Sequence, residues 1–200
     1  MNMHKPFSQA CENNKIPILT VIKDVFTQPV TVWEIGSGTG QHACYFAIAL
    51  PHLIWQPTDL AENIPSINAW RDEVQLLNLN PPIVLDVTDL IWPAAGIDAL
   101  FTANTLHIMS WQQVRTFFDR LGVVLNSQAD VCIYGPFNYK GNYTSDSNAR
   151  FDKWLKDRDH LSGIRNFEDV FNLAKNAGLE FINDHAMPAN NRLLVFKKVR

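Results

Sequence analysis

Hydrophobic positions along the chain alternate between short β-branched runs and longer stretches in which apolar residues recur at helical spacing. The short runs predict strands, which are, in chain order, Thr31–Ile35, Leu53–Pro57, Pro82–Leu85, Ile97–Ala103, Ala129–Tyr134, Phe181–Asn183 and Leu193–Phe196. The intervening stretches predict helices over 41–50, 64–77, 110–125 and 166–176. Strands that alternate with helices form a parallel sheet covered on both faces, so we predict an α/β fold.

The chemistry of the helix ends supports these boundaries. Ser110 is followed three residues later by Gln113, which is the spacing of a capping box. Asn166 can cap the last helix, and Gly178 can stop it. No helix separates the last two strands, which are joined by a turn at 188–191, so they must pair antiparallel or lie apart.

Two segments fall outside the alternating pattern of what we expect to be one domain spanning 1–200. Residues 1–28 lie before the first predicted strand. They predict a helical cap or lid, with a helix from Ile18 onward. Residues 135–165 form an insertion before the last helix, with a short helix around 151–156. Long connections of this kind are often functional lids.

Composition narrows the class of protein. The chain has 200 residues, a hydrophobic fraction of 46% and a net charge of −3, which is typical of a globular protein and gives no basic surface for nucleic acid. No apolar run is long enough for a signal peptide or a membrane span, so we expect a cytoplasmic protein without a membrane or nucleic-acid partner. Cys11, Cys44 and Cys132 are odd in number and irregularly spaced, which favours reduced thiols and no metal site.

A glycine-rich loop follows the first predicted strand and opens a helix, in the sequence Glu34-Ile35-Gly36-Ser37-Gly38-Thr39-Gly40. Glycines allow the backbone to turn sharply and to approach a ligand closely. We expect Gly36, Ser37, Gly38 and Gly40 to contact a nucleotide-like cofactor. The preceding Glu34 favours a ligand with an ammonium group, because a pyrophosphate would gain nothing from a carboxylate.

Two further carboxylates follow the next strands. Asp59 comes at the end of the second strand, where it can accept hydrogen bonds from two ribose hydroxyls, or cap a helix. Asp86 ends the third strand, where an adenine amino group would lie, or it serves as a turn residue. Ligands bind at the carboxyl edge of open α/β sheets, so Glu34, Asp59 and Asp86 together predict a nucleotide site there.

The fourth strand ends in Asn104-Thr105-Leu106-His107, which faces the reactive part of a ligand held by the glycine loop. We expect Asn104 to bind the cofactor and His107 to act as a general base or a substrate hydrogen-bond partner. A half-buried structural histidine is the alternative. His42, directly after the loop, either lines the pocket or lies in a cap or on the surface.

The motifs from Glu34 to Ala43, from Trp55 to Asp59 and from Leu85 to Thr88 resemble, in order, those of class I S-adenosylmethionine-dependent methyltransferases. The whole chain more specifically resembles the uncharacterised family of methyltransferase-like protein 26. That resemblance rests on Asn14-Lys15-x-Pro17-Ile18-Leu19, Tyr134-Gly135-Pro136-Phe137, Ser147-Asn148, Phe151-Asp152 and Met187-Pro188-Ala189-Asn190-Asn191.

The resemblance implies a Rossmann-like, mostly parallel sheet of seven strands with an antiparallel last strand, and S-adenosyl-L-methionine as cofactor, with S-adenosyl-L-homocysteine as product. Asn104 does not begin the Asn/Asp-Pro-Pro-Tyr motif of enzymes that methylate base or glutamine nitrogens, which argues against such an acceptor. We therefore expect a small-molecule acceptor, with polar contacts from Tyr139, Asn142, Arg158 and Arg165 in the insertion.

Three other functions fit parts of the pattern. A nicotinamide-dependent oxidoreductase would also place glycines and Asp59 as found, although Glu34 and the terminal strand pair count against it. A non-catalytic module could keep the cofactor pocket as a scaffold. A protein that only binds other proteins, with an empty pocket, would not explain why Glu34, Asp59 and Asp86 all follow strand ends.

Overall fold

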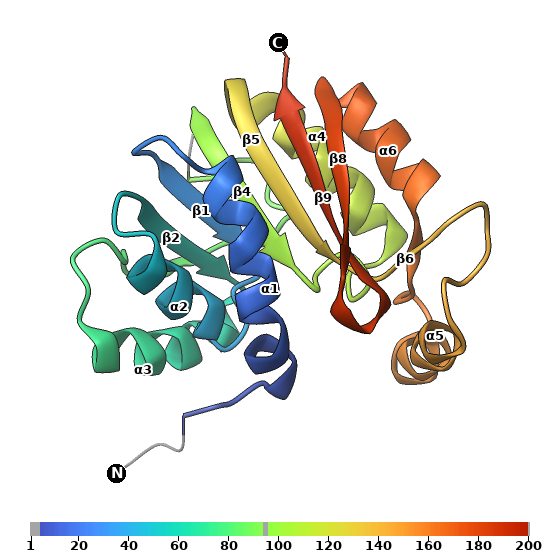
Figure 1. Ribbon diagram of the computed structural model, residues 1–200, viewed down its shortest axis with the longest axis horizontal. Helices are drawn as coiled ribbons and strands as arrows, with labels where there is room; N and C mark the ends of the chain where they lie inside the picture. The colour runs from blue at the N-terminus through green and yellow to red at the C-terminus, as the bar shows by residue number, and fades with distance from the viewer. Residues whose placement is uncertain (1–4, 94–95, 200) are drawn as a thin grey trace.

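Seven strands form one sheet in the computed structural model, which describes residues 5–93 and 96–199. The strand order is β3-β2-β1-β4-β5-β9-β8 (Figure 1). Neighbours among the first five pair in parallel, whereas β9 is antiparallel to both β5 and β8. The strands are β1 (Thr31–Ile35), β2 (Ile54–Asp59), β3 (Ile83–Val84), β4 (Ile97–Ala103), β5 (Leu125–Gly135), β8 (Leu179–Met187) and β9 (Asn191–Lys198). The predicted seven-stranded sheet with an antiparallel last strand is confirmed.

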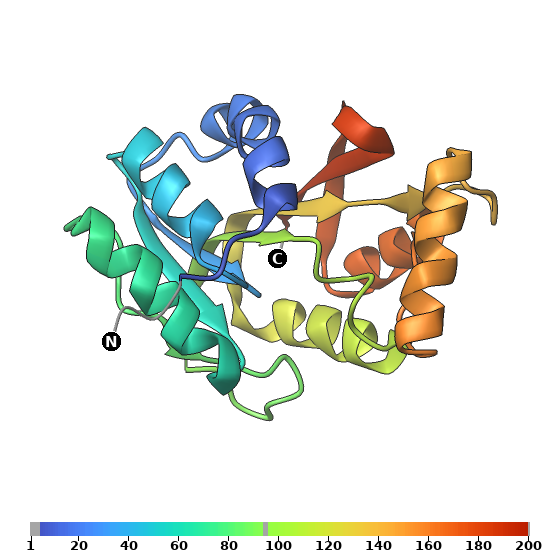
Figure 2. The same cartoon turned by 90° about the horizontal axis from the view of Figure 1, so that it is seen from below.

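Helices cover both faces of the sheet, as predicted (Figure 2). On one face lie α1 (Gln9–Val25), α2 (Gln41–Ala49) and α3 (Ile64–Val74), which share a core with Val32, Trp55 and Phe101. On the other face lie α4 (Trp111–Val124) and α6 (Phe167–Asn176), which pack on a core that includes Leu100 and Val131. Each strand of the middle of the sheet is therefore buried on both sides, which explains its continuous apolar runs.

The predicted N-terminal cap of α4 is present, whereas that of α6 differs from the prediction. The Ser110 hydroxyl accepts a hydrogen bond from the Gln113 amide at 3.2 Å, and the Gln113 side chain accepts one from the Ser110 amide at 2.8 Å, so the capping box is confirmed. Asn166 is the N-cap residue of α6, but its side chain donates to Asp169 at 3.0 Å instead of accepting from the helix backbone. Gly178 follows the end of α6 with φ +76°, as a helix stop requires.

The first helix is longer than predicted. It begins at Gln9 and not at Ile18, because the Ser8 hydroxyl caps it by accepting from the Cys11 amide at 3.3 Å. Pro17, which suggests a helix start, lies inside α1. Residues 1–4 of the predicted 1–28 cap, His4 among them, lie outside the described residues.

The 135–165 insertion contains β6 (Phe137–Asn138) and α5 (Asp146–Arg158), and β6 pairs in parallel with β7 (Arg165–Asn166). The buried Asp152 carboxylate fixes this segment, because it accepts from the Tyr143 hydroxyl at 2.6 Å, the Lys156 ammonium at 2.6 Å and the Ile164 amide at 2.7 Å. Helix α5 lies beyond the ends of β5 and β9 and covers neither face of the sheet (Figures 1 and 2).

Two general features of the described residues bear on function. Over 5–93 and 96–199, no helix combines the length and apolar character that a membrane crossing needs. Within the same ranges, no group of three or more His, Cys, Asp or Glu side chains is arranged to hold a metal ion. Cys44 and Cys132 are buried free thiols, and Cys11 is a partly buried one.

Candidate functional site: a cleft at the carboxyl ends of the strands

A cleft of about 1020 Å³ opens at the carboxyl edge of the parallel strands. Its walls include the glycine loop after β1, the chain at the ends of β2, β3, β4 and β5, helices α1 and α5, and the turn between β8 and β9. In Figure 1 these elements meet at the lower edge of the sheet. The volume exceeds that of many single-ligand pockets, so it has room for a nucleotide-sized cofactor beside a second small molecule.

The glycine loop is packed so tightly on two sides that side chains are excluded there. A Cβ on Gly36 would lie 2.4 Å from the Thr105 methyl group, and one on Gly40 would lie 2.9 Å from the Ile67 Cα. Gly38 is different, because a Cβ there would meet nothing within 4 Å. The three glycines have φ values of +74°, +91° and +57°, respectively, which favour glycine. The loop therefore presents bare backbone at Gly38 to the cleft.

Asp59 joins this loop to the end of β2. One carboxylate oxygen accepts from the Gly38 amide at 2.6 Å, and the other accepts from the Leu60 amide at 2.7 Å and the Asn63 side chain at 2.8 Å. Asp59 lines the cleft and is 8% exposed. A carboxylate has about four acceptor positions, so one, on the Gly38-bonded oxygen, remains for a hydroxyl donor from the cleft.

Asp86 and Asn104 also line the cleft. The Asp86 carboxylate accepts from the amide of Thr88 at 2.8 Å and from its hydroxyl at 2.7 Å, so the turn role foreseen as an alternative is present. Asn104 has φ +61°, and its amide donates to the Tyr134 carbonyl at 2.8 Å. This left-handed conformation of a non-glycine residue costs free energy and is typical of functional sites.

Glu34 lies behind the glycine loop instead of in the cleft. It is 1% exposed, and its carboxylate accepts from the Trp55 indole at 2.9 Å. Burial raises the pKa of Glu34 to about 7, against the indole hydrogen bond, which favours the charged form. The predicted direct contact with a ligand ammonium does not fit this geometry, because the side chain points into the core under α2 and is not among the cleft-lining residues. Ser37 does line the cleft, and its buried hydroxyl has no hydrogen-bond partner among the described residues.

His107 lines the cleft and is 6% exposed. Its ring meets Phe151 of α5 edge-on at 5.3 Å, and no described residue makes a hydrogen bond to its ring nitrogens. Burial and, to a smaller extent, the charges of Arg165 and Arg158 together lower the pKa of His107 to about 4. The imidazole is therefore neutral at physiological pH and able to accept a proton or a hydrogen bond.

Of the four polar residues of the insertion that were predicted to contact the acceptor, some line the cleft and others do not. Arg158 lines the cleft. Tyr139 does not, because its hydroxyl donates to Asp184 at 2.6 Å, and Asn142 donates to the Lys140 carbonyl at 2.9 Å in a surface turn.

Arg165 is also outside the cleft lining. Its guanidinium donates to the backbone carbonyls of Leu106 at 3.0 Å, of Met109 and of Leu161 at 3.0 Å. Arg165 thus holds the loop that carries His107, and its contact with a substrate stays a prediction.

Sequence reasoning missed several residues that line the cleft. His42, which was left between pocket and surface, lines it, with a ring nitrogen 2.6 Å from the Asn14 side-chain oxygen and its ring stacked on Phe46 at 5.3 Å. Burial lowers the pKa of His42 to about 4. Tyr134 and Asn191 line the cleft beside Asn14. Asn14, Tyr134 and Asn191 all belong to the unusual short motifs of the sequence, and the fold brings these motifs together at the cleft.

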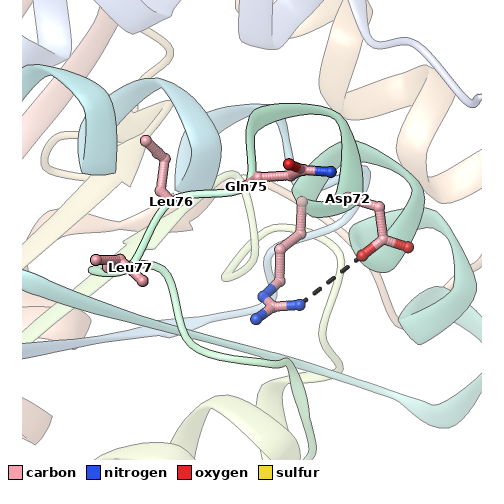
Figure 3. A pocket seen from close by; sticks show the side chains of 5 residues that line it. Asp72, Gln75, Leu76 and Leu77 are labelled. Atoms are coloured by element: carbon pink, nitrogen blue, oxygen red, sulfur yellow. Dashed lines mark ion pairs between the residues drawn. The ribbon is translucent and has the colours of Figure 1, made fainter.

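A second, smaller depression of about 340 Å³ lies at the end of α3. It is lined by Arg71, Asp72, Gln75, Leu76 and Leu77, with 3.8 Å between the charged groups of Arg71 and Asp72 (Figure 3). None of these residues lines the large cleft, and none was predicted as a site residue. We therefore take the large cleft as the functional site.

Several solved structures with a similar fold are methyltransferases by name. An O-methyltransferase family protein from Burkholderia thailandensis has a TM-score of 0.83 at 15% identity, over 95% of this chain and 57% of its own. The apo S-adenosylmethionine-dependent methyltransferase SibL has a TM-score of 0.78 at 20% identity, over 96% of this chain and 56% of its own.

An O-methyltransferase family 2 protein from Planctomyces limnophilus, solved in complex with apigenin, has a TM-score of 0.74 at 14% identity, over 84% of this chain and 51% of its own. This chain thus spans about half the length of these proteins. At such identities the likeness shows the fold, which is that of class I methyltransferases.

At the level of sequence, a family model described as a protein of unknown function, DUF938, matches residues 5–198. The chain belongs to this family.

Proposed function

We propose that this member of the DUF938 family binds S-adenosylmethionine in the large cleft and transfers its methyl group to a small-molecule acceptor. The observation that carries the proposal is the junction of Gly38 and Asp59, where bare backbone and a partly free carboxylate face the same cavity. The finer resemblance to methyltransferase-like protein 26 agrees with this function and adds no acceptor.

The residues present fit the cofactor. The Gly38 backbone leaves open space that a side chain would fill, and the unpartnered Ser37 hydroxyl can bond to a polar group of the ligand. Asp59 is suited to a ribose hydroxyl and Asp86, after β3, to the adenine end, whereas Asn104, after β4, lies toward the reactive part of the cofactor. When bound, S-adenosylmethionine supplies a methyl group already activated by its sulfonium.

The protein then has to orient the acceptor, exclude water and take up a proton. Alignment alone can supply several kcal/mol of the barrier reduction. The neutral His107 ring, with both nitrogens free of described protein partners, can accept a hydrogen bond from an acceptor hydroxyl and orient it. Arg165 keeps this ring in place by binding the backbone around it. Helix α1, which lines the cleft through Cys11, acts as a cover over the cofactor.

Thermal unfolding with a panel of ligands tests the cofactor. We expect S-adenosylmethionine and S-adenosylhomocysteine to raise the melting temperature, because a ligand that binds only the native state stabilises it by mass action. NAD and NADP, which many glycine-loop proteins bind, are the matched controls. A rise in melting temperature with either dinucleotide, and none with S-adenosylmethionine, would indicate that the cleft belongs to an oxidoreductase instead.

A further inference from the structure

The end of the cleft farthest from the glycine loop carries an aromatic ladder on α5, formed by Phe151, Trp154 and Arg158. The Phe151 and Trp154 rings are 5.8 Å apart and nearly parallel, at 14°. The Arg158 guanidinium lies 5.0 Å from the Trp154 ring centre. His107 meets the other end of the ladder through its edge contact with Phe151. The ladder therefore starts at the neutral imidazole and ends at a cation.

Trp154 is unusual because it is 54% exposed although it lines a cavity. Its indole N–H makes no hydrogen bond to a described residue. An exposed aromatic surface inside a cleft is typical of a place where a flat ligand packs, since burial of one aromatic face contributes more free energy than most other contacts of that size.

Arg158 is the only lysine or arginine among the residues that line the cleft within the described chain. Its guanidinium forms no ion pair with a described carboxylate. The carboxylates of the lining are Asp59 and Asp86 at the cofactor end and Asp159 next to Arg158, and one Asp159 oxygen already accepts from the Leu161 amide at 3.0 Å. The charges of Arg158 and Arg165 both act on His107.

We propose, resting on the methyl-transfer function above, that the acceptor has a flat aromatic body that packs against Phe151 and Trp154 and an acidic group that pairs with Arg158. Phe151 and Arg158 are seven residues apart on one helix, which corresponds to about 10 Å along its axis. The hydroxyl that receives the methyl group, held at His107, therefore lies about that far from the acidic group. A guanidinium suits a carboxylate because both are planar and can form two parallel hydrogen bonds.

Two rigid probes of this length test the inference: 4′-hydroxybiphenyl-4-carboxylate and its neutral carboxamide, titrated calorimetrically into protein saturated with S-adenosylhomocysteine. We expect the wild type to bind the acid roughly tenfold more tightly than the amide, as one charge-assisted contact would give. Higher ionic strength reduces this preference, because the pair is near the surface.

Variants separate charge from shape. Arg158→Gln should abolish the preference for the acid, Arg158→Lys should retain part of it, and Arg150→Gln, on the same helix and outside the cleft lining, should leave it intact. Trp154→Ala should reduce the affinity for both probes by the same factor. Equal binding of acid and amide by the wild type, or loss of the preference in Arg150→Gln, would overturn the inference.

Failure of this inference is distinguishable from failure of the proposed function. The S-adenosylhomocysteine titration that precedes each probe reports on the cofactor site alone. Cofactor binding without binding of either biphenyl overturns the acceptor class and leaves methyl transfer standing. Absence of cofactor binding overturns the proposed function.

Discussion

At the glycine end of the cleft the backbone makes the surface, whereas at the α5 end side chains from distant parts of the chain make it. Gly36 and Gly40 leave no space for a Cβ, and Asp59 is tied to the loop by a short hydrogen bond. The α5 end instead brings together His107, which follows β4, and Phe151 and Trp154 of α5. Under the proposed function, the glycine end binds the cofactor and the α5 end selects the acceptor.

The same contrast appears in the buried titratable groups. Glu34, under the glycine loop, has a raised pKa and is engaged with Trp55. His107, at the other end, has a lowered pKa and free ring nitrogens. A residue whose partners are all in the protein stabilises the fold, whereas one that lacks partners is available to a ligand.

The largest expected effect is at Gly40. We expect Gly40→Ala to lower the free energy of unfolding by about 3 kcal/mol, because a Cβ would meet the Ile67 backbone and the φ of +91° is unfavourable for alanine. Gly38→Ala is the matched control, with the left-handed strain but no clash. It should cost only about 1 kcal/mol in urea unfolding while weakening S-adenosylhomocysteine binding. Equal stability of the two variants would contradict this view of the loop.

Glu34 should make the protein less stable as pH rises. Its pKa of about 7 in the native state lies above the ordinary value of 4.5, so the unfolded chain binds fewer protons between these pH values and stability is lost on the alkaline side. Relative to wild type, Glu34→Gln should gain roughly 2.5 kcal/mol between pH 5 and pH 8. Urea titrations at both pH values measure the gain, and Glu180→Gln, at an exposed position, should show none.

His107 should act in the opposite direction. Its pKa of about 4 lies below the ordinary 6.5, so the stability that its neutral form contributes is present above pH 6.5 and is lost as pH falls toward 4. Between pH 7.5 and pH 5, His107→Gln should lose about 2 kcal/mol less than wild type. His160→Gln, which changes an exposed histidine, serves as control, and an identical acid loss in all three proteins would refute the assignment.

The smallest expected effect lies outside the cleft. Tyr139→Phe removes the hydrogen bond to Asp184 and should cost about 1 kcal/mol of stability. Because Tyr139 does not line the cleft, binding of S-adenosylhomocysteine and of the biphenyl acid should not change. A selective loss of acid binding would return Tyr139 to the acceptor site and weaken the contrast between the two ends.

The sequence was sufficient for the sheet and for the position of the glycine loop, because both depend on local patterns. Apolar runs of the right length gave the strands, and glycines between a strand and a helix gave the loop. The direction of the Glu34 side chain could not be predicted, since it depends on Trp55 of a neighbouring strand. Neither could the start of α1 at Gln9, where a serine cap outweighed the signal of Pro17.

The acceptor end could be predicted only as a region. Tyr139, Asn142 and Arg165 have the polar character of substrate ligands, but tertiary contacts engage their polar groups elsewhere. Nothing in the local sequence indicated that Trp154 lines the cleft, because the helical periodicity of a sequence does not distinguish an exposed tryptophan from a buried one. Its place in the cleft follows from the buried Asp152, which fixes α5 to the chain around it.

The central claim is that the Gly38–Asp59 junction binds S-adenosylmethionine, and calorimetric titration with S-adenosylhomocysteine tests it most directly. We expect the wild type to bind one equivalent, Asp59→Ala to bind at least roughly tenfold more weakly through loss of charged hydrogen bonds, and Asp119→Ala, exposed on α4, to bind like wild type. No binding by the folded wild type, or undiminished binding by a folded Asp59→Ala variant, would contradict the account.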